Sequence, residues 1–330
     1  MKKVLVTGGA GFIGSHIVEN LLSLKFNVIV LDNLSTGRLE NLDNFKKSVD
    51  FIKCDLSDYQ KLYKFKKKFE KLDYVIHLAA LADIVPSIEN PYMYFESNVI
   101  GTLNLLKTLK LKKIKKFLYA ASSSCYGLPN KFPTNENEEI NPMYPYALTK
   151  RLGEEILLHW SKLYKFPFIS LRLFNVYGTR SRTSGTYGAM FGVFLAQKLK
   201  NKPFTVVGNG KQTRDFTYVT DVADAFIAAM ESDILYDIFN VGSNATVSVN
   251  KITDLLGGKK LYIPKRPGEP DCTFADISKI KKKLNWYPKI TIEDGVSKLL
   301  NNINYWKSAP LWTPKKIDKA TKSWFKYLNK

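Results

Sequence analysis

The chain has 330 residues, 45% of them hydrophobic, which is enough for one large α/β domain with a smaller one attached. It contains no run of eighteen apolar residues, and a strand begins within three residues of the N-terminus, so we expect neither a membrane span nor a signal peptide. The net charge of +20 comes mainly from lysines spread over predicted helices, with only seven arginines, so it can attract anionic substrates but argues against nucleic-acid binding.

The first two dozen residues predict a dinucleotide site. Val4–Val6 form an apolar strand, a glycine turn follows, and a helical pattern begins at Gly11. This order brings backbone N–H groups and the positive end of a helix to one point, which suits a pyrophosphate. Gly8 permits the tight turn, Gly11 lets the phosphates approach the backbone, and Gly14 lets helix and strand pack closely.

A second apolar strand, residues 27–32, ends in a carboxylate. At this spacing, Asp32 can accept hydrogen bonds from an adenosine ribose, which favours NAD over NADP. The alternative is a glycine-containing turn beside a chance aspartate. The order of strand, turn, helix, strand and acid favours the dinucleotide site, and the turn 33–38 would lie at its adenosine end.

Strands and helices continue to alternate up to residue 173. We predict further strands at 49–54, 74–80, 117–121 and 168–173, and helices after Asp55, over about 92–109 and over 146–164. This alternation predicts an α/β fold with a doubly wound, mostly parallel Rossmann sheet. Ligands of such sheets bind at the carboxyl ends of the strands.

Beyond residue 173 we expect the chain to leave the sheet. The predicted elements are a Gly/Ser/Thr/Tyr-rich loop at 180–192, a helix to Leu199, a hairpin at 205–210, a helix at 221–230 and a strand at 237–241 that can return to the sheet. We assign residues 1–174, with return segments at about 213–242, to an NAD-binding Rossmann domain. Residues 175–212 and 243–305 would form a smaller α+β substrate lobe, and residues 306–330 a helical tail.

The cysteines are few and scattered. Cys54, Cys125 and Cys272, like the three histidines, lack the spacing of metal ligands. We therefore expect a reducing, cytoplasmic environment and no metal site.

Tyr146 and Lys150 lie four residues apart at a helix start, so both side chains project from one face. A nearby ammonium group and the positive NAD⁺ ring both favour the phenolate, so the tyrosine can act as a general base far below its free pKa of about 10. Ser122, at a neighbouring strand end, can share the proton. Such a pair alone is more often a helix-surface pair, but the dinucleotide fold and the serine cluster 122–124 favour catalysis.

Together these motifs resemble the extended short-chain dehydrogenases/reductases of the NAD-dependent sugar epimerase/dehydratase family. The similarity runs from residue 3 to about 305 and is greatest to UDP-glucose and UDP-N-acetylglucosamine 4-epimerases. In chain order, the motifs are Thr7–Gly14, Asp55-Leu56, His77–Ala80, Asn98–Thr102, Ser122–Gly127, Tyr146-x-x-x-Lys150, Phe174–Gly178, Arg214–Val219 and Arg266–Glu269.

The resemblance implies a catalytic set of Tyr146 as base, Lys150 on the nicotinamide ribose, and Ser122. It also implies a tightly bound, retained NAD. The residues expected to contact it are Gly8, Gly11, Phe12, Ile13, Gly14, Asp32, Asn33, Ser35, Thr36, Gly37, Asp55, Leu56, Leu78, Ala79, Ala80, Asn98, Ala120, Tyr146 and Lys150. Those expected to hold a nucleotide-diphosphate sugar are Ser123, Ser124, Asn175, Arg214, Arg266 and Glu269. Arginine suits phosphate oxygens, although two arginines in separate loops can also be solvated surface charges.

The serine cluster bears on the reaction. The family's dehydratases carry Asp and Glu after the catalytic Ser/Thr, and its decarboxylases use a Glu there, whereas this chain has Ser123 and Ser124. Hydride transfer at C4 needs only the tyrosine, serine and lysine. We therefore predict a C4 epimerase that oxidises C4, lets the 4-keto sugar turn over, and returns the hydride to the other face.

Other outcomes stay open at this point. A 4-dehydrogenase acting on a UDP- or GDP-linked hexose or heptose would need the same residues and would release the 4-keto sugar. A cofactor-binding scaffold without activity is disfavoured by the intact Tyr146, Lys150 and Ser122. The resemblance also implies surface-polysaccharide synthesis and a homodimer in which the helices at 92–109 and 146–164 pair across a two-fold axis.

Overall fold

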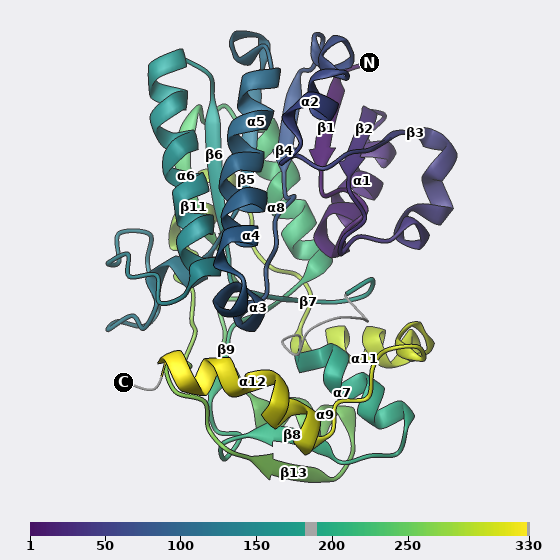
Figure 1. The fold of residues 1–330 in the computed structure, drawn as a ribbon, viewed down its shortest axis with the longest axis vertical. Helices are drawn as coiled ribbons and strands as arrows, with labels where there is room; N and C mark the ends of the chain where they lie inside the picture. The colour runs from purple at the N-terminus through teal and green to yellow at the C-terminus, as the bar shows by residue number, and fades with distance from the viewer. Residues whose placement is uncertain (182–189, 329–330) are drawn as a thin grey trace.

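The computed structural model describes residues 1–181 and 190–328. Its upper part in Figure 1 is a seven-stranded sheet in which every neighbouring pair of strands is parallel. Across the sheet the strands are β11 (Tyr236–Val241), β6 (Phe168–Leu173), β5 (Lys116–Ser122), β4 (Tyr74–His77), β1 (Lys3–Thr7), β2 (Asn27–Asp32) and β3 (Val49–Lys53). The predicted Rossmann sheet is confirmed, and the strand predicted at 237–241 does return to it, beside β6.

Helices cover both faces of this sheet. Val4 and Val6 of β1 belong to a core with α1 (Phe12–Ser23) and α8 (Val219–Glu231), while Leu5 belongs to a core with α5 (Gly101–Thr108) and α6 (Pro145–Tyr164). Successive residues of a strand point to opposite faces, so a strand that is covered on both sides is apolar throughout. This is why the sequence of β1 reads as a short continuous apolar run.

Two helical predictions need correction in detail. The helix expected over 92–109 consists of α4 (Pro91–Phe95), a π-helical turn at Glu96–Ile100, and α5. The lysine-rich stretch after Asp55 forms only α2 (Tyr59–Tyr63) and a 3₁₀ turn at Lys66–Phe69, because three lysines in succession leave Phe69 as that turn's only buried residue. An additional helix, α3 (Ile84–Glu89), follows β4. Other 3₁₀ segments are Leu39–Ser48, Leu111–Lys113, Ser123–Tyr126 and Ile303–Trp306.

The lower part of the molecule in Figure 1 contains short strand pairs and helices. β7 (Asn175–Tyr177) pairs with β10 (Phe216–Tyr218), β8 (Phe204–Val207) with β13 (Lys260–Ile263), and β9 (Thr213–Arg214) with β12 (Val247–Ser248). The helices of this part are α7 (Met190–Leu199), α9 (Val249–Leu256), α11 (Ile292–Asn301) and α12 (Pro314–Leu328), whereas α10 (Ser278–Leu284) packs against β11 at the edge of the sheet.

The hairpin predicted at 205–210 is wrong. The turn itself exists, since Gly208 and Gly210 both have positive φ, at 60° and 71°. The chain then leads into β9, however, and β8 takes β13 as a parallel partner from much later in the sequence. Turn residues thus identified a change of direction but not the strand that pairs.

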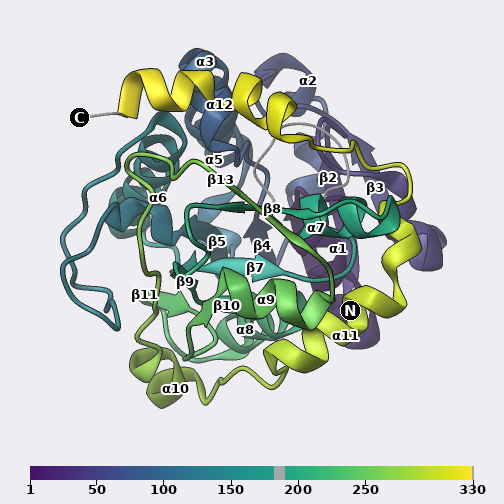
Figure 2. The ribbon, with the colours of Figure 1, turned by 90° about the horizontal axis from the view of Figure 1, so that it is seen from below.

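α12 is the last helix that the structure describes. It lies beside α3 in both views (Figures 1 and 2), and its buried side chains are Ile317, Thr321 and Trp324. Residues 182–189 of the loop predicted at 180–192 fall outside the described ranges. None of the helices described is both long enough and apolar enough to cross a membrane.

Candidate active site

A cleft of about 680 Å³ lies where the carboxyl ends of the sheet strands meet the lower part of the molecule. Gly8, Asp32, Ala79 and Ser122 line it from the ends of four different strands, as expected for a doubly wound sheet. Every site residue predicted from the sequence lines this cleft except Gly37 and Asn98. The structure therefore brings together segments from residue 8 to residue 269.

The glycine turn at the start of α1 leaves no room for side chains. Gly8 has a φ of +71°, and a Cβ atom there would lie 2.8 Å from the backbone nitrogen of Ala79. A Cβ on Gly14 would lie 2.2 Å from the carbonyl oxygen of Gly8. Gly11 is the N-cap of α1, and no side chain caps the helix. The turn therefore presents backbone to the cleft, which fits the pyrophosphate of NAD.

Asp32 is held at the end of β2 by backbone donors. Its carboxylate accepts hydrogen bonds from the backbone nitrogens of Ala10 at 3.0 Å and Leu34 at 2.8 Å. Burial raises the pKa of Asp32, and these two hydrogen bonds oppose the rise. A Cβ on Gly37 would lie 2.9 Å from both carboxylate oxygens, so Gly37 lets the turn fold against Asp32 rather than facing the cleft.

A chain of hydrogen bonds through His77 joins β1, β4 and α5. Thr7 Oγ1 and His77 Nδ1 lie 2.6 Å apart, and His77 Nε2 and Thr102 Oγ1 lie 2.9 Å apart. Since the Thr102 hydroxyl donates to the carbonyl of Asn98, it must accept from His77, which places the proton on Nε2. Burial lowers the pKa of His77 to about 3, with Lys150 as a lesser cause, so this histidine is neutral.

Asn98 lies one layer behind the cleft, in the π-helical turn. Its Oδ1 accepts from the backbone nitrogen of Leu81 at 2.8 Å, and its Nδ2 donates to the Leu81 carbonyl and to Thr149 Oγ1, both at 3.0 Å. Asn98 is buried and all its polar atoms are paired. Asn98 thus fixes the cleft wall that follows β4, and its predicted contact with NAD stays a prediction.

The predicted catalytic residues meet at the floor of the cleft. The Tyr146 hydroxyl donates to Ser122 Oγ at 3.3 Å, and Ser122 Oγ lies 2.8 Å from Ser124 Oγ. Burial raises the pKa of Tyr146, against hydrogen bonds from Ser122 and Ser124. In the protein alone, desolvation of the buried phenol dominates, and the lower pKa predicted beside Lys150 and NAD⁺ stays a prediction.

Lys150 is buried beside this group. Its Nζ lies 4.2 Å from the centre of the Tyr119 ring, where the ring can stabilise the ammonium group by a cation–π contact. Burial lowers the pKa of Lys150 to about 7, and Glu154, one helical turn further along α6, opposes that change. The charge of Lys150 therefore depends strongly on what else occupies the site.

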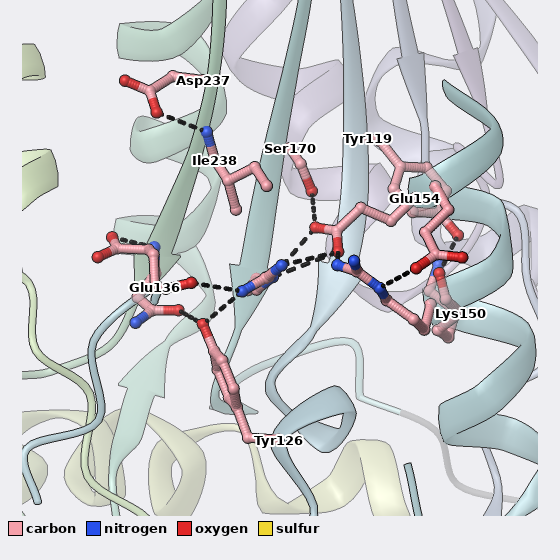
Figure 3. A network of polar contacts seen from close by, with 12 residues as sticks. Tyr119, Tyr126, Glu136, Lys150, Glu154, Ser170, Asp237 and Ile238 are labelled. Atoms are coloured by element: carbon pink, nitrogen blue, oxygen red, sulfur yellow. Dashed lines mark hydrogen bonds and ion pairs between the residues drawn. The ribbon is translucent and has the colours of Figure 1, made fainter. Parts of the chain in front are cut away.

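Glu154 belongs to a buried polar network that anchors α6 to β6 (Figure 3). Its carboxylate accepts from Arg172 at 3.0 and 3.1 Å, from Ser170 at 2.5 Å and from Arg151 at 2.7 Å. Arg172 also donates to the Tyr126 hydroxyl at 2.9 Å. With Glu154 and Arg172 both almost fully buried, this ion pair positions the helix that carries Tyr146 and Lys150.

The far end of the cleft is lined by ionic side chains from the lower part of the molecule. Arg214 Nη2 donates to Glu269 Oε1 at 3.0 Å, and Arg266 Nε lies 3.7 Å from Glu269 Oε2. Glu269 therefore contacts both arginines, and the substrate contact predicted for it stays a prediction. Asn175 Oδ1 accepts from Thr273 Oγ1 at 2.8 Å.

Sequence reasoning missed several residues of this site. Tyr144 and Trp324 line the cleft, and the pair of Glu154 and Arg172 lies behind it. The sequence gives one sign of a buried ion pair, because Arg172 is the one charged residue in the mainly apolar strand 168–173. For Trp324 there was no sign, because it lies beyond residue 305, where the recognised motifs end.

Comparisons with known proteins agree with this geometry. Residues 4–242, which do not include α12, match the model of the NAD dependent epimerase/dehydratase family. The chain is 38% identical over 305 residues to a putative UDP-glucose 4-epimerase of Methanocaldococcus jannaschii, covering 90% of this chain and 97% of that protein. It is 37% identical over 314 residues to a UDP-glucuronate 4-epimerase of Thermodesulfobacterium geofontis, covering 90% and 94%.

Solved structures are similar over nearly the whole chain. The UDP-glucose 4-epimerase of Thermotoga maritima with UDP-glucose has a TM-score of 0.83 at 33% identity, and covers 93% of this chain and 99% of that one. The Thermus thermophilus UDP-glucose 4-epimerase in complex with NAD also has a TM-score of 0.83 at 33% identity, covering 92% and 99%.

Proposed function

Because the chain belongs to the NAD-dependent epimerase/dehydratase family and is thus an NAD-dependent enzyme, we propose that it interconverts nucleotide sugars that differ in configuration at C4. The observation that carries this proposal is the contact between Tyr146 and Ser122 in the cleft that the glycine turn and the two arginines also line. A sugar nucleotide with its phosphates at the arginines would present its sugar to Tyr146.

The residues of the upper cleft fit NAD. The pyrophosphate would lie at Gly8, Gly11 and Gly14, the adenosine ribose at Asp32, and the adenine beside Asp55 and Leu56. Lys150 would hold the nicotinamide ribose. When bound, NAD accepts a hydride from C4 and returns it. We propose that it is retained between turnovers, since no second substrate is then needed.

The chain's own residues would move the proton. Tyr146 takes the proton of the C4 hydroxyl as the hydride leaves, with Ser122 bridging the two oxygens, and gives it back to the keto oxygen afterwards. Because burial alone raises the pKa of Tyr146, the base needs positive charge nearby, which Lys150 supplies when it is protonated. Arg214 and Arg266, steadied by Glu269, would bind the diphosphate.

Two alternatives receive less support. The positions after Ser122 hold Ser123 and Ser124, so the acids expected of a dehydratase or a decarboxylase are missing there. A 4-dehydrogenase that releases the keto sugar uses the same residues. It is not favoured, however, because the similar proteins named above carry epimerase names.

The test is proton NMR of the protein with a panel of UDP-, GDP- and dTDP-linked hexoses and heptoses, with no cofactor added. We expect a C4 epimer to accumulate far beyond the enzyme concentration. In Tyr146→Phe, kcat should fall by about 10²–10⁴-fold while the bound NAD remains, because only the proton carrier is lost. A keto product that stops near one equivalent, or full activity of the variant, would contradict the proposal.

We also propose a homodimer formed through α4, α5 and α6, which lie side by side in Figure 1. Large apolar side chains on α4 and α6 are exposed, as expected for an uncovered interface. They are Tyr92, Met93, Phe95, Leu148, Leu163 and Tyr164. Sedimentation at micromolar concentration should give twice the mass of the 37.6 kDa chain, and a monomer would disprove the interface.

A further inference from the structure

α12 lies along one rim of the cleft and joins its two sides. Ser323 Oγ donates to Glu89 Oε1 of α3 at 3.0 Å, and Trp324 Nε1 donates to the carbonyl of Pro267 at 2.6 Å. α3 follows β4 on the cofactor side, whereas Pro267 lies between Arg266 and Glu269 on the substrate side. Hydrogen bonds therefore fix α12 on both sides of the cleft. Figures 1 and 2 agree, since both show α12 beside α3.

Trp324 forms part of the cleft wall. Only 4% of the residue is exposed, yet it lines the cleft. The guanidinium of Arg266 lies 5.3 Å from its ring centre, a cation–π contact. The ring centre of Trp324 also lies 6.5 Å from that of Tyr144, which in turn stacks on Tyr146 at 6.3 Å and 12°.

These contacts form a continuous series of side chains, from Tyr146 through Tyr144 and Trp324 to Arg266. In the proposed function, Tyr146 meets C4 of the sugar and Arg266 meets the diphosphate, so the sugar itself must lie between these two ends. The middle of the series, Tyr144 and Trp324, then faces the sugar. Aromatic rings are suited to this position, since they offer a large rigid surface to apolar C–H groups.

We propose that Trp324 of α12 is a specificity-determining residue, which closes the cleft around the sugar of the nucleotide-sugar substrate and limits the size of its substituents. The inference rests on the proposed function. It goes beyond it, because α12 lies outside the residues that the family model matches. Replacing the indole by a smaller side chain widens the cleft where the sugar would lie, and it removes the surface on which Arg266 packs.

The experiment compares a hexose and the corresponding N-acetylhexosamine, both carrying the nucleotide that the wild type accepts. In Trp324→Ala, the ratio of kcat/KM for the N-acetylhexosamine to that for the hexose should rise by at least about fivefold, since a widened pocket favours the larger substituent. Trp324→Phe, which keeps a smaller ring, should shift the ratio in the same direction by about twofold. It replaces the alanine variant as the test if that variant does not fold.

Two control variants distinguish a Trp324 that contacts the sugar from a Trp324 that only holds α12 in place. Ile317→Ala removes a side chain on the same helix that is equally buried, at 3% exposure, but does not line the cleft. Tyr327→Ala removes an exposed ring from the helix. Both should leave the ratio within about twofold of the wild type, since neither touches the site. NAD content and the melting temperature are measured in every variant.

An unchanged ratio in both Trp324 variants, or an equal shift in Ile317→Ala, would overturn the inference while leaving the proposed function intact. A wild type that turns over no nucleotide sugar of the panel would instead overturn the proposed function, and this inference with it. A shift confined to the two Trp324 variants would support both.

Discussion

The two sides of the cleft are built in different ways. On the cofactor side, the chain presents backbone, as at Gly8 and Gly14, where an added Cβ atom would meet other backbone atoms. On the substrate side, it presents charged and aromatic side chains from distant segments, such as Arg214 with Glu269 and Arg266 with Trp324. A backbone cradle tolerates almost no substitution and suits a constant cofactor, whereas exchangeable side chains suit a substrate that varies among relatives.

The largest expected effect on cofactor binding is at the glycine turn. In Gly14→Ala, the new methyl group would lie 2.2 Å from the carbonyl oxygen of Gly8, and neither backbone segment can move without opening the turn. We expect NAD affinity to fall by more than about 100-fold, which is about 2.7 kcal/mol. The measurement is the NAD content of the purified protein, followed by titration with NAD.

The matched control is Gly268→Ala on the substrate side. Gly268 also has a positive φ, at 66°, but its nearest neighbour is the end of the flexible Met143 side chain, at 3.4 Å. This variant should keep its NAD and change only the KM for the sugar nucleotide. Equal loss of NAD in both variants would break the distinction between the two sides.

The buried network behind α6 should give the largest effect on folding stability. Glu154→Gln leaves the guanidinium of Arg172 buried without its counter-charge, which costs about 3–5 kcal/mol. Chemical denaturation measures this loss. The control is Glu155→Gln, whose half-exposed carboxylate pairs with Arg151 and should contribute less than about 1 kcal/mol. Similar losses in the two variants would mean that Glu154 does not hold α6 in place.

A smaller, pH-dependent effect should come from His77 in the cofactor half. Its pKa falls from an ordinary 6.5 to about 3 on folding, chiefly through burial. Below pH 6.5 the unfolded chain binds a proton that the folded chain rejects, so stability decreases as the pH falls toward 3, by up to about 1.4 kcal/mol per pH unit. Stability measured between pH 5 and 6.5 should therefore vary less steeply in His77→Gln than in the wild type.

His159→Gln, which replaces an exposed histidine, should keep the wild-type slope. If His77→Gln kept it as well, His77 would have to take up its proton in the folded state. The chain of hydrogen bonds from Thr7 to Asn98 would then be wrong.

The cofactor side could be predicted from the sequence because its signals are local. The strand 168–173 and the turn from Gly8 to Gly14 are each identified by the types of a few neighbouring residues. The hairpin at 205–210 failed for the opposite reason, since β13 is a partner that no local signal identifies. Burial raises the pKa of Tyr146 in the protein alone, a contribution that depends on the complete fold and that the spacing of Tyr146 and Lys150 does not indicate. Trp324 belongs to no motif, and only the folded chain brings it to the cleft.

The position of β11 at the sheet edge bears on how the protein is made. β6 ends at Leu173, but its neighbour β11 begins only at Tyr236, after the chain has formed α7, β8 and α8. During synthesis, the sheet stays open along β6 until the ribosome has released residue 241. Until then, β6 offers unpaired backbone groups to any other strand. If the first 174 residues folded separately, the exposed edge of β6 could pair with other chains and aggregate. Residues 236–241 are needed to cover that edge.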